Sequence, residues 1–469
     1  MATAQASVTR DIDLLRRLER LPFSWMQGRL LIMGGLGYTF DASSNAIVAF
    51  ILPTATTLFK LTNAQTGLLG SSVLIGYLVG ALFAGILGDQ IGRKRIMMHA
   101  LALYCSASLL AACSMNWGFL FWTRVVAGIG TGAEAAIVAP FLSEFIQGRY
   151  RGRYVGSLAG FFSFGFVFAA IIGYLIVPAN YLGWRIVQVI TAVPIIMLLW
   201  WRRALPESPR WLLQKHRYAE AEQVVSRLEK DVERSTGHAL PPTSSIVLRS
   251  ATSTADGSWI SNLRMLWSRP LRRHSVMLWV LWVAITFSFY GFFTWIPSLL
   301  VRQGLTVTRS FRYSIMIYLA QIPGYYSAAF LCEKLDRKWT MIAYMFGGAL
   351  SALLMANSRD HITIILFGCF LSFFMNGTYA VIYAYTPELY PTAIRATGMG
   401  VASAVGRVGG ILAPIIIGVT FAKIGFGGVF SLTTLILLIG TITVAFLGTH
   451  TSGKALEEIG LQEMSSQIE

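Results

Sequence analysis

The sequence is poor in charge. Only 13% of its 469 residues are Asp, Glu, Lys or Arg, whereas an ordinary soluble domain carries roughly 25%. Hydrophobic side chains make up 55% of the chain. This balance excludes an ordinary soluble enzyme, and it makes the distribution of the apolar residues the first question to answer.

Cysteine is also scarce, and its positions suggest no chemistry. The four cysteines lie in apolar segments, at spacings that match neither a disulfide framework nor a metal site. They are Cys105, Cys113, Cys332 and Cys369. We therefore expect them to be small core residues, and we expect no metal and no other cofactor.

Long charge-free runs recur along the whole chain. A bilayer core about 30 Å thick needs roughly 20 apolar residues in a helix that crosses it. The longest such runs are residues 61 to 88, 96 to 123, 154 to 184, 274 to 301, 313 to 332, 339 to 358, 361 to 387 and 424 to 453. Divided at charged, Gly, Asn and Pro positions, the apolar regions predict twelve helices that start near residues 29, 65, 96, 117, 154, 184, 274, 312, 339, 361, 396 and 425. The chain is thus predicted to be an all-α membrane protein.

The formal net charge of +16 is explained by topology rather than by a nucleic-acid partner. With both termini in the cytoplasm, 29 of the 38 Lys and Arg residues fall in inside segments and seven in outside loops. The remaining two, Arg124 and Arg407, lie within helices. Because cytoplasmic loops carry the excess of Lys and Arg, we expect a multi-pass protein of the inner (plasma) membrane with both termini inside.

A long polar stretch divides the twelve helices six and six. It runs from about Arg202 to Arg273 and contains a charged helical run followed by a Ser/Thr-rich linker. At the N-terminus, Ile12, Leu15 and Leu18 recur at helical spacing among arginines, which predicts a helix on the membrane surface. The expected units are an amphipathic N-terminal segment (1–28), a first six-helix bundle (29–203), a cytoplasmic linker with helices (204–273), a second six-helix bundle (274–449) and a cytoplasmic tail (450–469).

The two halves resemble each other at one offset of 244 positions. Asp89 to Lys94 matches Glu333 to Lys338, and Pro53 matches Pro297. Glu144 and Arg151 likewise match Glu388 and Arg395. A duplicated six-helix unit is typical of transporters that bind their substrate between two bundles near the membrane midplane.

Several motifs carry a family resemblance over essentially the whole chain. Gly85 to Lys94 resembles the signature loop of the major facilitator superfamily, and Pro206 to Leu212 and Pro387 to Thr392 resemble its sugar-porter and organic-ion branches. Asp41, Gly130 to Glu134, Trp295 to Pro297 and Gly406 to Gly410 resemble bacterial metabolite symporters of the nicotinate and aromatic-acid type. The seventh helix lacks the paired glutamines of sugar porters. The resemblance implies two pseudo-symmetric six-helix bundles and a monomeric transporter, not an enzyme.

The sequence contains no phosphate-binding loop of the kind that ATP-driven transporters use. The nearest approach, Gly448 to Lys454, is followed by Ala455 where a Ser or Thr is required, and an apolar helix rather than a strand precedes it. We therefore expect transport to be driven by ion gradients.

Four charges lie well inside the predicted helices: Asp41, Arg124, Glu134 and Arg407. Unpaired, each costs about 2.5–3.5 kcal/mol on insertion scales, so a function or a partner is expected. In the resembling sugar porters the first two positions carry proton coupling, which makes Asp41 the expected protonation site and Arg124 its partner. A permanent structural pair is the alternative. Glu134 is a rival proton carrier that could instead anchor packing among glycines.

Arg407 is the expected substrate contact, because glycines flank it and its planar guanidinium suits a carboxylate. Its alternative is a structural bond to a helix carbonyl or to Glu134. Aromatic faces on the seventh and tenth helices favour a flat ring, although such stripes are often ordinary packing. The candidate pocket residues are Asn45, Phe289, Tyr290, Phe293, Gln321, Tyr379 and Tyr383.

Charged residues also cluster at the predicted cytoplasmic ends of the helices. By resemblance to the family they form salt bridges that hold an inner gate, while topology signals and lipid contacts are the alternatives. They are Asp89, Arg93, Glu144, Arg151, Glu333, Arg337, Glu388 and Arg395.

Together these patterns predict a proton-coupled importer of a small organic anion, nicotinate or a similar aromatic carboxylate. Its partners would be this substrate, protons and the lipid bilayer, and no nucleic acid. One alternative is a sugar or polyol symporter that uses Asp41 in the same way. Another is a transporter-like receptor that binds ligand without net flux.

Overall fold

The computed structural model describes residues 12–243, 259–391 and 394–451. Within these ranges the chain forms helices and turns and no strand. Ten segments are long and apolar enough to cross a membrane. The longest of them, in α17 (Arg395–Leu447), is two helices joined at Gly425, where φ is 62°. With α2 (Trp25–Leu58), whose 34 residues reach about 51 Å at roughly 1.5 Å per residue, the expected twelve spans are present.

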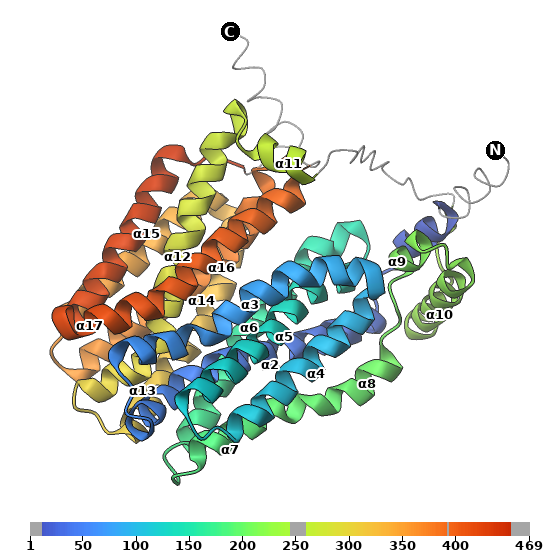
Figure 1. Cartoon of the computed structure of the whole chain (residues 1–469). Coiled ribbons are helices and arrows are strands. Elements are labelled where there is room, and N and C mark those ends of the chain that lie inside the picture. The colour runs from blue at the N-terminus through green and yellow to red at the C-terminus, as the bar shows by residue number, and fades with distance from the viewer. Residues whose placement is uncertain (1–11, 244–258, 392–393, 452–469) are drawn as a thin grey trace.

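The spans form two groups of six (Figure 1). The first consists of α2, α3 (Asn63–Ile91), α4 (Arg93–Ala112), α5 (Trp117–Ser143), α6 (Gly148–Ile176) and the run α7 (Gly183–Ala192), η1 (Val193–Ile196), α8 (Met197–Ala204). The second consists of α12 (Arg269–Arg302), the pair α13 (Val307–Leu319) and α14 (Gln321–Leu335), α15 (Arg337–Ala356), α16 (His361–Glu388) and the two arms of α17. Between the groups lie α9 (Pro209–Gln214), α10 (Tyr218–Thr236) and α11 (Trp259–Leu266).

The internal repeat appears in the coordinates at the offset expected from the sequence. Adding 244 to the bounds of α2 gives those of α12, and adding 244 to those of α4 gives those of α15. Gly92 and Asp336, also 244 apart, break the chain between two helices with φ of 113° and 84° and ψ of 142° and 147°. The same left-handed corner therefore turns the chain in both halves, once on glycine and once on a non-glycine residue.

The two halves meet closely at one end of the molecule. We call the end that carries Gly92, α10 and the end of α17 the terminal face, and the other end the distal face. Near the distal face α3 packs on α17, where a Cβ on Gly67 would lie 2.6 Å from the Pro414 carbonyl oxygen. The Ser71 hydroxyl donates to the Ile411 carbonyl at 2.6 Å. The halves are thus closed together at the distal face.

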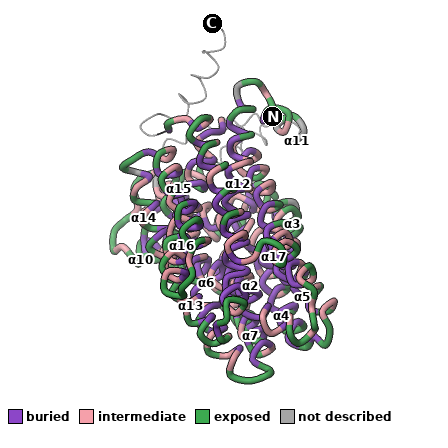
Figure 2. The backbone as a smooth tube through the Cα atoms, turned by 90° about the vertical axis from the view of Figure 1, so that its left-hand side faces the viewer, coloured by how far each residue is buried: buried purple, intermediate pink, exposed green. Residues whose placement is uncertain are grey.

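At the terminal face the peripheral helices of the two halves lie apart, α9 and α10 with the first and α11 with the second (Figure 1). Buried residues gather along the middle of the molecule, around α2 and α12 (Figure 2). Here α6 and α14 still connect the halves, since the Tyr325 hydroxyl donates to the Gly156 carbonyl at 3.1 Å. The halves therefore pack closely at the distal face, while the peripheral helices α10 and α11 stand apart at the terminal face.

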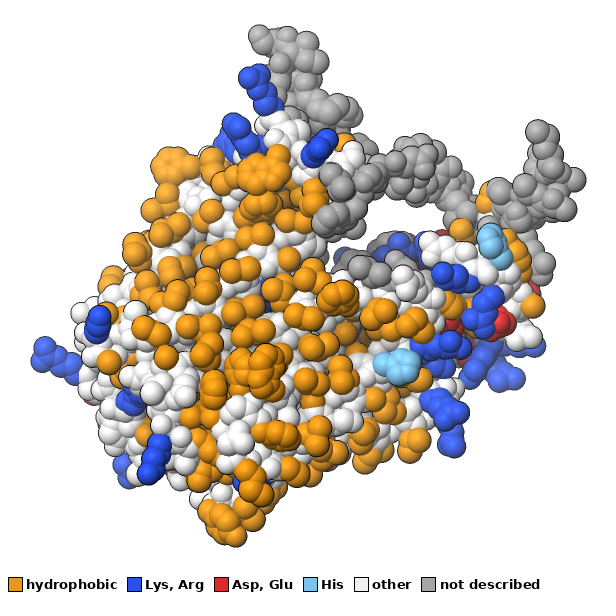
Figure 3. All heavy atoms as spheres, in the orientation of Figure 1, with side chains coloured by type: hydrophobic (Ala, Val, Ile, Leu, Met, Phe, Trp, Pro, Cys, Tyr) orange, Lys and Arg blue, Asp and Glu red, His pale blue; other side chains and the backbone are white. Residues whose placement is uncertain are grey.

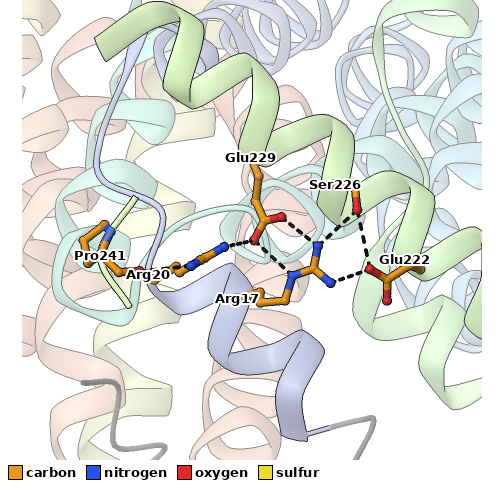
Figure 4. Close-up of polar contacts among 6 residues, drawn as sticks. All are labelled: Arg17, Arg20, Glu222, Ser226, Glu229 and Pro241. Carbon is orange, nitrogen blue, oxygen red and sulfur yellow. Dashed lines mark hydrogen bonds and ion pairs between the residues drawn. The ribbon is translucent and has the colours of Figure 1, made fainter. Parts of the chain in front are cut away.

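The N-terminal helix differs from the sequence-based expectation of a membrane-surface helix. Residues 12–19 are helical, but Leu14, Leu18 and Leu21 are buried in one core with α10 residues. Arg17 forms ion pairs with Glu222 and with Glu229, the latter at 2.7 Å, and Arg20 binds Glu229 at 2.6 Å (Figure 4). An amphipathic pattern does not tell whether lipid or protein covers the apolar face, and here protein covers it.

Candidate functional site

Asp41 and Glu134 face each other in the interior of the first bundle. Both side chains are 0% exposed, and none of their carboxyl oxygens has a hydrogen-bond partner among the described residues. One turn before Asp41, a Cβ on Gly37 would lie 2.5 Å from Glu134 Oε1, so glycine makes room for the second acid. Two carboxyl groups are therefore buried close together in the first bundle.

Arg124 is occupied by other partners. Its guanidinium donates to Gln188 Oε1 at 2.9 Å, to Ser44 Oγ at 3.2 Å and to the Ser44 carbonyl. These bonds join α5 to α7 and α2. No ion pair between Arg124 and Asp41 occurs within the described chain, so the two residues expected to pair are not in contact in this state. Arg124 instead fixes the α2 backbone one turn beyond Asp41.

Arg407 lies where the two halves meet. Its Nη1 donates to the Tyr290 hydroxyl at 2.8 Å, and its guanidinium carbon lies 4.1 Å from the centroid of the Tyr77 ring. The contacts come from α12 and α3, on opposite sides of the repeat. The glycines beside Arg407 do not leave open space, since a Cβ on Gly410 would lie 2.8 Å from Tyr290 Cδ2. They allow α12 to approach α17, and only Nη1 of Arg407 is bound to Tyr290.

The aromatic residues expected in the pocket form one connected cluster. The Phe289 ring lies 4.5 Å from Phe293 and 4.9 Å from Tyr379, and Tyr379 stacks on Tyr383 at 6.3 Å, centroid to centroid. The Tyr379 hydroxyl is buried and has no partner within the described residues. Tyr290, which accepts a hydrogen bond from Arg407, has its ring centroid 5.3 Å from that of Phe289, so the cluster lies next to the cation. The cluster therefore combines flat apolar surfaces with one fixed positive charge.

A small cavity between the halves adjoins this cluster. It is lined by Asn45, Ala46, Ala49, Gly70, Val73, Leu74, Phe166, Tyr290, Phe293 and Thr294. Asn45 Oδ1 is buried and lacks a partner among the described residues. Tyr77, Phe166 and Thr294 did not emerge from the sequence, because a contact across the two halves leaves no spacing signal in either half.

Gln321 lies deeper in the second bundle. It is fully buried, and neither of its amide atoms has a partner in the described part of the chain. Its backbone carbonyl accepts from Asn376 Nδ2 at 2.9 Å, and the same nitrogen donates to Ser163 Oγ at 2.7 Å. Asn376, which the sequence did not place among the pocket residues, thus connects α6 of one half with α14 and α16 of the other.

The charged residues expected at the gate form bonds within each half. Arg93 pairs with Glu144, and Arg337 pairs with Glu388 at 3.1 Å, two pairs that the repeat relates. Arg151 pairs with Glu19 at 3.1 Å. Arg395 donates to the Tyr390 carbonyl at 3.3 Å. The side chains of Asp89 and Glu333 lie outside the described residues.

Twelve spans in two repeated bundles, packed together at the distal face beside a small cavity, form the architecture of a membrane transporter. Residues 34–462 match the family model described as "Sugar (and other) transporter", and the chain belongs to this family of the major facilitator superfamily. It is a multi-pass membrane protein that transports a small molecule.

Two relatives and one solved structure set the context. The chain is 39% identical to the "Niacin transporter NiaP" of Acinetobacter baylyi, over 96% of this chain and 100% of that protein. It is 33% identical to the "Putative niacin/nicotinamide transporter NiaP" of Bacillus subtilis, over 92% and 98%. The fold is similar to a partially occluded inward-open structure of the xylose transporter XylE from E. coli, with a TM-score of 0.75 at 16% identity over 92% and 100%.

Proposed function

We propose that the protein imports nicotinate or a similar aromatic carboxylate together with a proton. The observation that carries the proposal is Arg407 at the contact of the two bundles, beside a cluster of aromatic rings. A guanidinium binds a carboxylate through paired hydrogen bonds, and the rings suit a flat heteroaromatic. The name of the relative that is 39% identical, a niacin transporter, supports this substrate class.

The proton is assigned to the Asp41–Glu134 pair. Like charges at close range and burial both disfavour two ionised carboxylates, so the pair is most stable when it holds one proton. Opening to the other face changes the packing of α2 against α5 and admits water, which releases the proton. Arg124 acts here as a positioning residue, because it holds the Ser44 carbonyl one turn from Asp41.

The orientation follows from the charge distribution. We propose that the terminal face is cytoplasmic, because the basic loops lie there, and that the protein lies in the inner (plasma) membrane and works as a monomer. A carboxylate that enters with one proton moves no net charge. The pH gradient would therefore drive uptake, whereas the membrane potential would not.

Proteoliposome uptake of labelled nicotinate tests the substrate and the coupling. Acidifying the outside should raise the initial rate, a potassium diffusion potential should leave it unchanged, and benzoate should compete whereas glucose should not. Competition by glucose but not by benzoate would instead favour the sugar or polyol symporter. Binding without counterflow of labelled nicotinate would favour the receptor that carries no flux.

A further inference from the structure

A surface pocket on the first bundle lies outside the proposed transport path. It has a volume of about 410 Å³ and is lined by Arg29, Ile196, Leu199, Trp200, Arg203, Ala204 and Arg227. The three arginines come from α2, α8 and α10, and Arg29 of α2 is far in the sequence from the other two. The volume falls within the roughly 300–1,000 Å³ of pockets that hold small molecules.

The charge of this pocket is uncompensated. No Asp or Glu lines it, and none of its three arginines forms an ion pair within the described residues. Lys94 adds a positive charge beside α8, where its Nζ donates to the Arg202 carbonyl at 3.0 Å. The carboxylate near Lys94, Glu207, already accepts a hydrogen bond from the Lys94 backbone at 3.1 Å. Several cations at close range repel one another, and a bound anion would relieve that repulsion.

The remaining wall is apolar and open to the membrane. Ile196 and Leu199 are 65% and 67% exposed, although they lie in the last turns of the span Gly183–Ala204. Arg203 follows in the final turn, where the hydrocarbon region meets the headgroups. In Figure 3 hydrophobic side chains cover the middle of the molecule, and Lys and Arg gather at the right-hand end, where Figure 1 places α8 and α10. The cations lie at the level of the lipid headgroups and suit a phosphate, and the apolar wall below them suits an acyl chain.

We propose that this pocket binds an anionic phospholipid, with its phosphate between Arg29, Arg203 and Arg227 and an acyl chain along Ile196 and Leu199. A lipid is favoured over a soluble phosphate because half of the wall is apolar and faces the bilayer. The bound phosphate joins α10 to α2 and α8. Because Glu229 of α10 also binds the N-terminal helix, the lipid stabilises the packing of both α10 and the N-terminal helix on the first bundle.

The test measures lipid binding and does not depend on the transported substrate. Delipidated full-length protein in detergent is titrated with phosphatidylglycerol and, separately, with phosphatidylcholine, whose choline cation cancels the charge. Retained lipid is counted by native mass spectrometry. The variant R29Q/R203Q/R227Q is compared with R264Q/R269Q/R272Q, which removes the same charge from exposed arginines of α11 and α12.

We expect phosphatidylglycerol to bind wild type and the control variant equally, and phosphatidylcholine to bind more weakly. At about 1 kcal/mol per arginine near a charged headgroup, the pocket variant should lose about fivefold in affinity per arginine and roughly 100-fold in total. Equal affinity in the pocket variant, or the same loss in the control, would overturn the proposal. Displacement of phosphatidylglycerol by millimolar glycerol phosphate would show a site for a soluble anion instead.

Discussion

Replacing Arg407 by lysine keeps the positive charge and removes the planar pair of donors. In the structure one donor already binds the Tyr290 hydroxyl at 2.8 Å, and arginine still has donors left for a carboxylate. A lysine at this position has one ammonium group to divide between Tyr290 and the ligand. The substitution therefore removes about one hydrogen bond between charged groups, which contributes about 1.5–3 kcal/mol. R407K should weaken nicotinate binding about tenfold to 150-fold.

Isothermal titration of nicotinate into purified protein gives the affinity directly. Y290F removes one neutral hydrogen-bond partner and leaves the guanidinium, so its loss should be smaller, about two- to twelvefold for roughly 0.5–1.5 kcal/mol. R312K is the matched control, because Arg312 is exposed and lies 5.5 Å from the Tyr313 ring, away from the cavity. An unchanged affinity in R407K would refute the assignment of the substrate carboxylate to Arg407.

Two further predictions concern closure and pH. G67V should trap the protein open at the distal face, because a Cβ at Gly67 would lie 2.6 Å from the Pro414 carbonyl oxygen. Uptake should be lost in this variant, while substrate binding remains. The control variant G85V should transport normally, because a Cβ at Gly85 would have no neighbour within 4 Å. Burial raises the pKa of Glu229, but hydrogen bonds from Arg17 and Arg20 outweigh it and lower the pKa below 4.5. Wild type should therefore unfold at a higher temperature than E229Q above about pH 5, and this advantage should shrink as the pH falls and Glu229 is protonated; an advantage that does not shrink with falling pH would contradict this account.

The sequence predicted the helices closely, because the length and polarity of a helix are visible within its own segment. It predicted the repeat because the two halves align at one offset. The expected starts near 117, 361 and 425 coincide with α5, α16 and the bend in α17. Helical spacing grouped the aromatic residues of the seventh and tenth helices, and the structure brings Phe289 and Tyr379 together and places Arg407 in contact with Tyr290; their role in substrate binding stays a prediction.

Pairings between helices were harder to predict. Asp41 faces Glu134 rather than Arg124 because the rotation of each helix about its axis depends on packing, here on the space left by Gly37. The contact of Arg407 with Tyr77 joins the two halves. Residue spacing within one half cannot predict such a contact. The sequence located four charged residues inside the helices, but it did not predict which residues they contact.

The central claim is that the Asp41–Glu134 pair carries the proton that drives transport. The most direct measurement compares wild type and D41N in proteoliposomes, in nicotinate counterflow without a gradient and in uptake driven by an imposed pH gradient. The account predicts that D41N retains counterflow and loses accumulation driven by the gradient. Accumulation by D41N equal to that of wild type would contradict it.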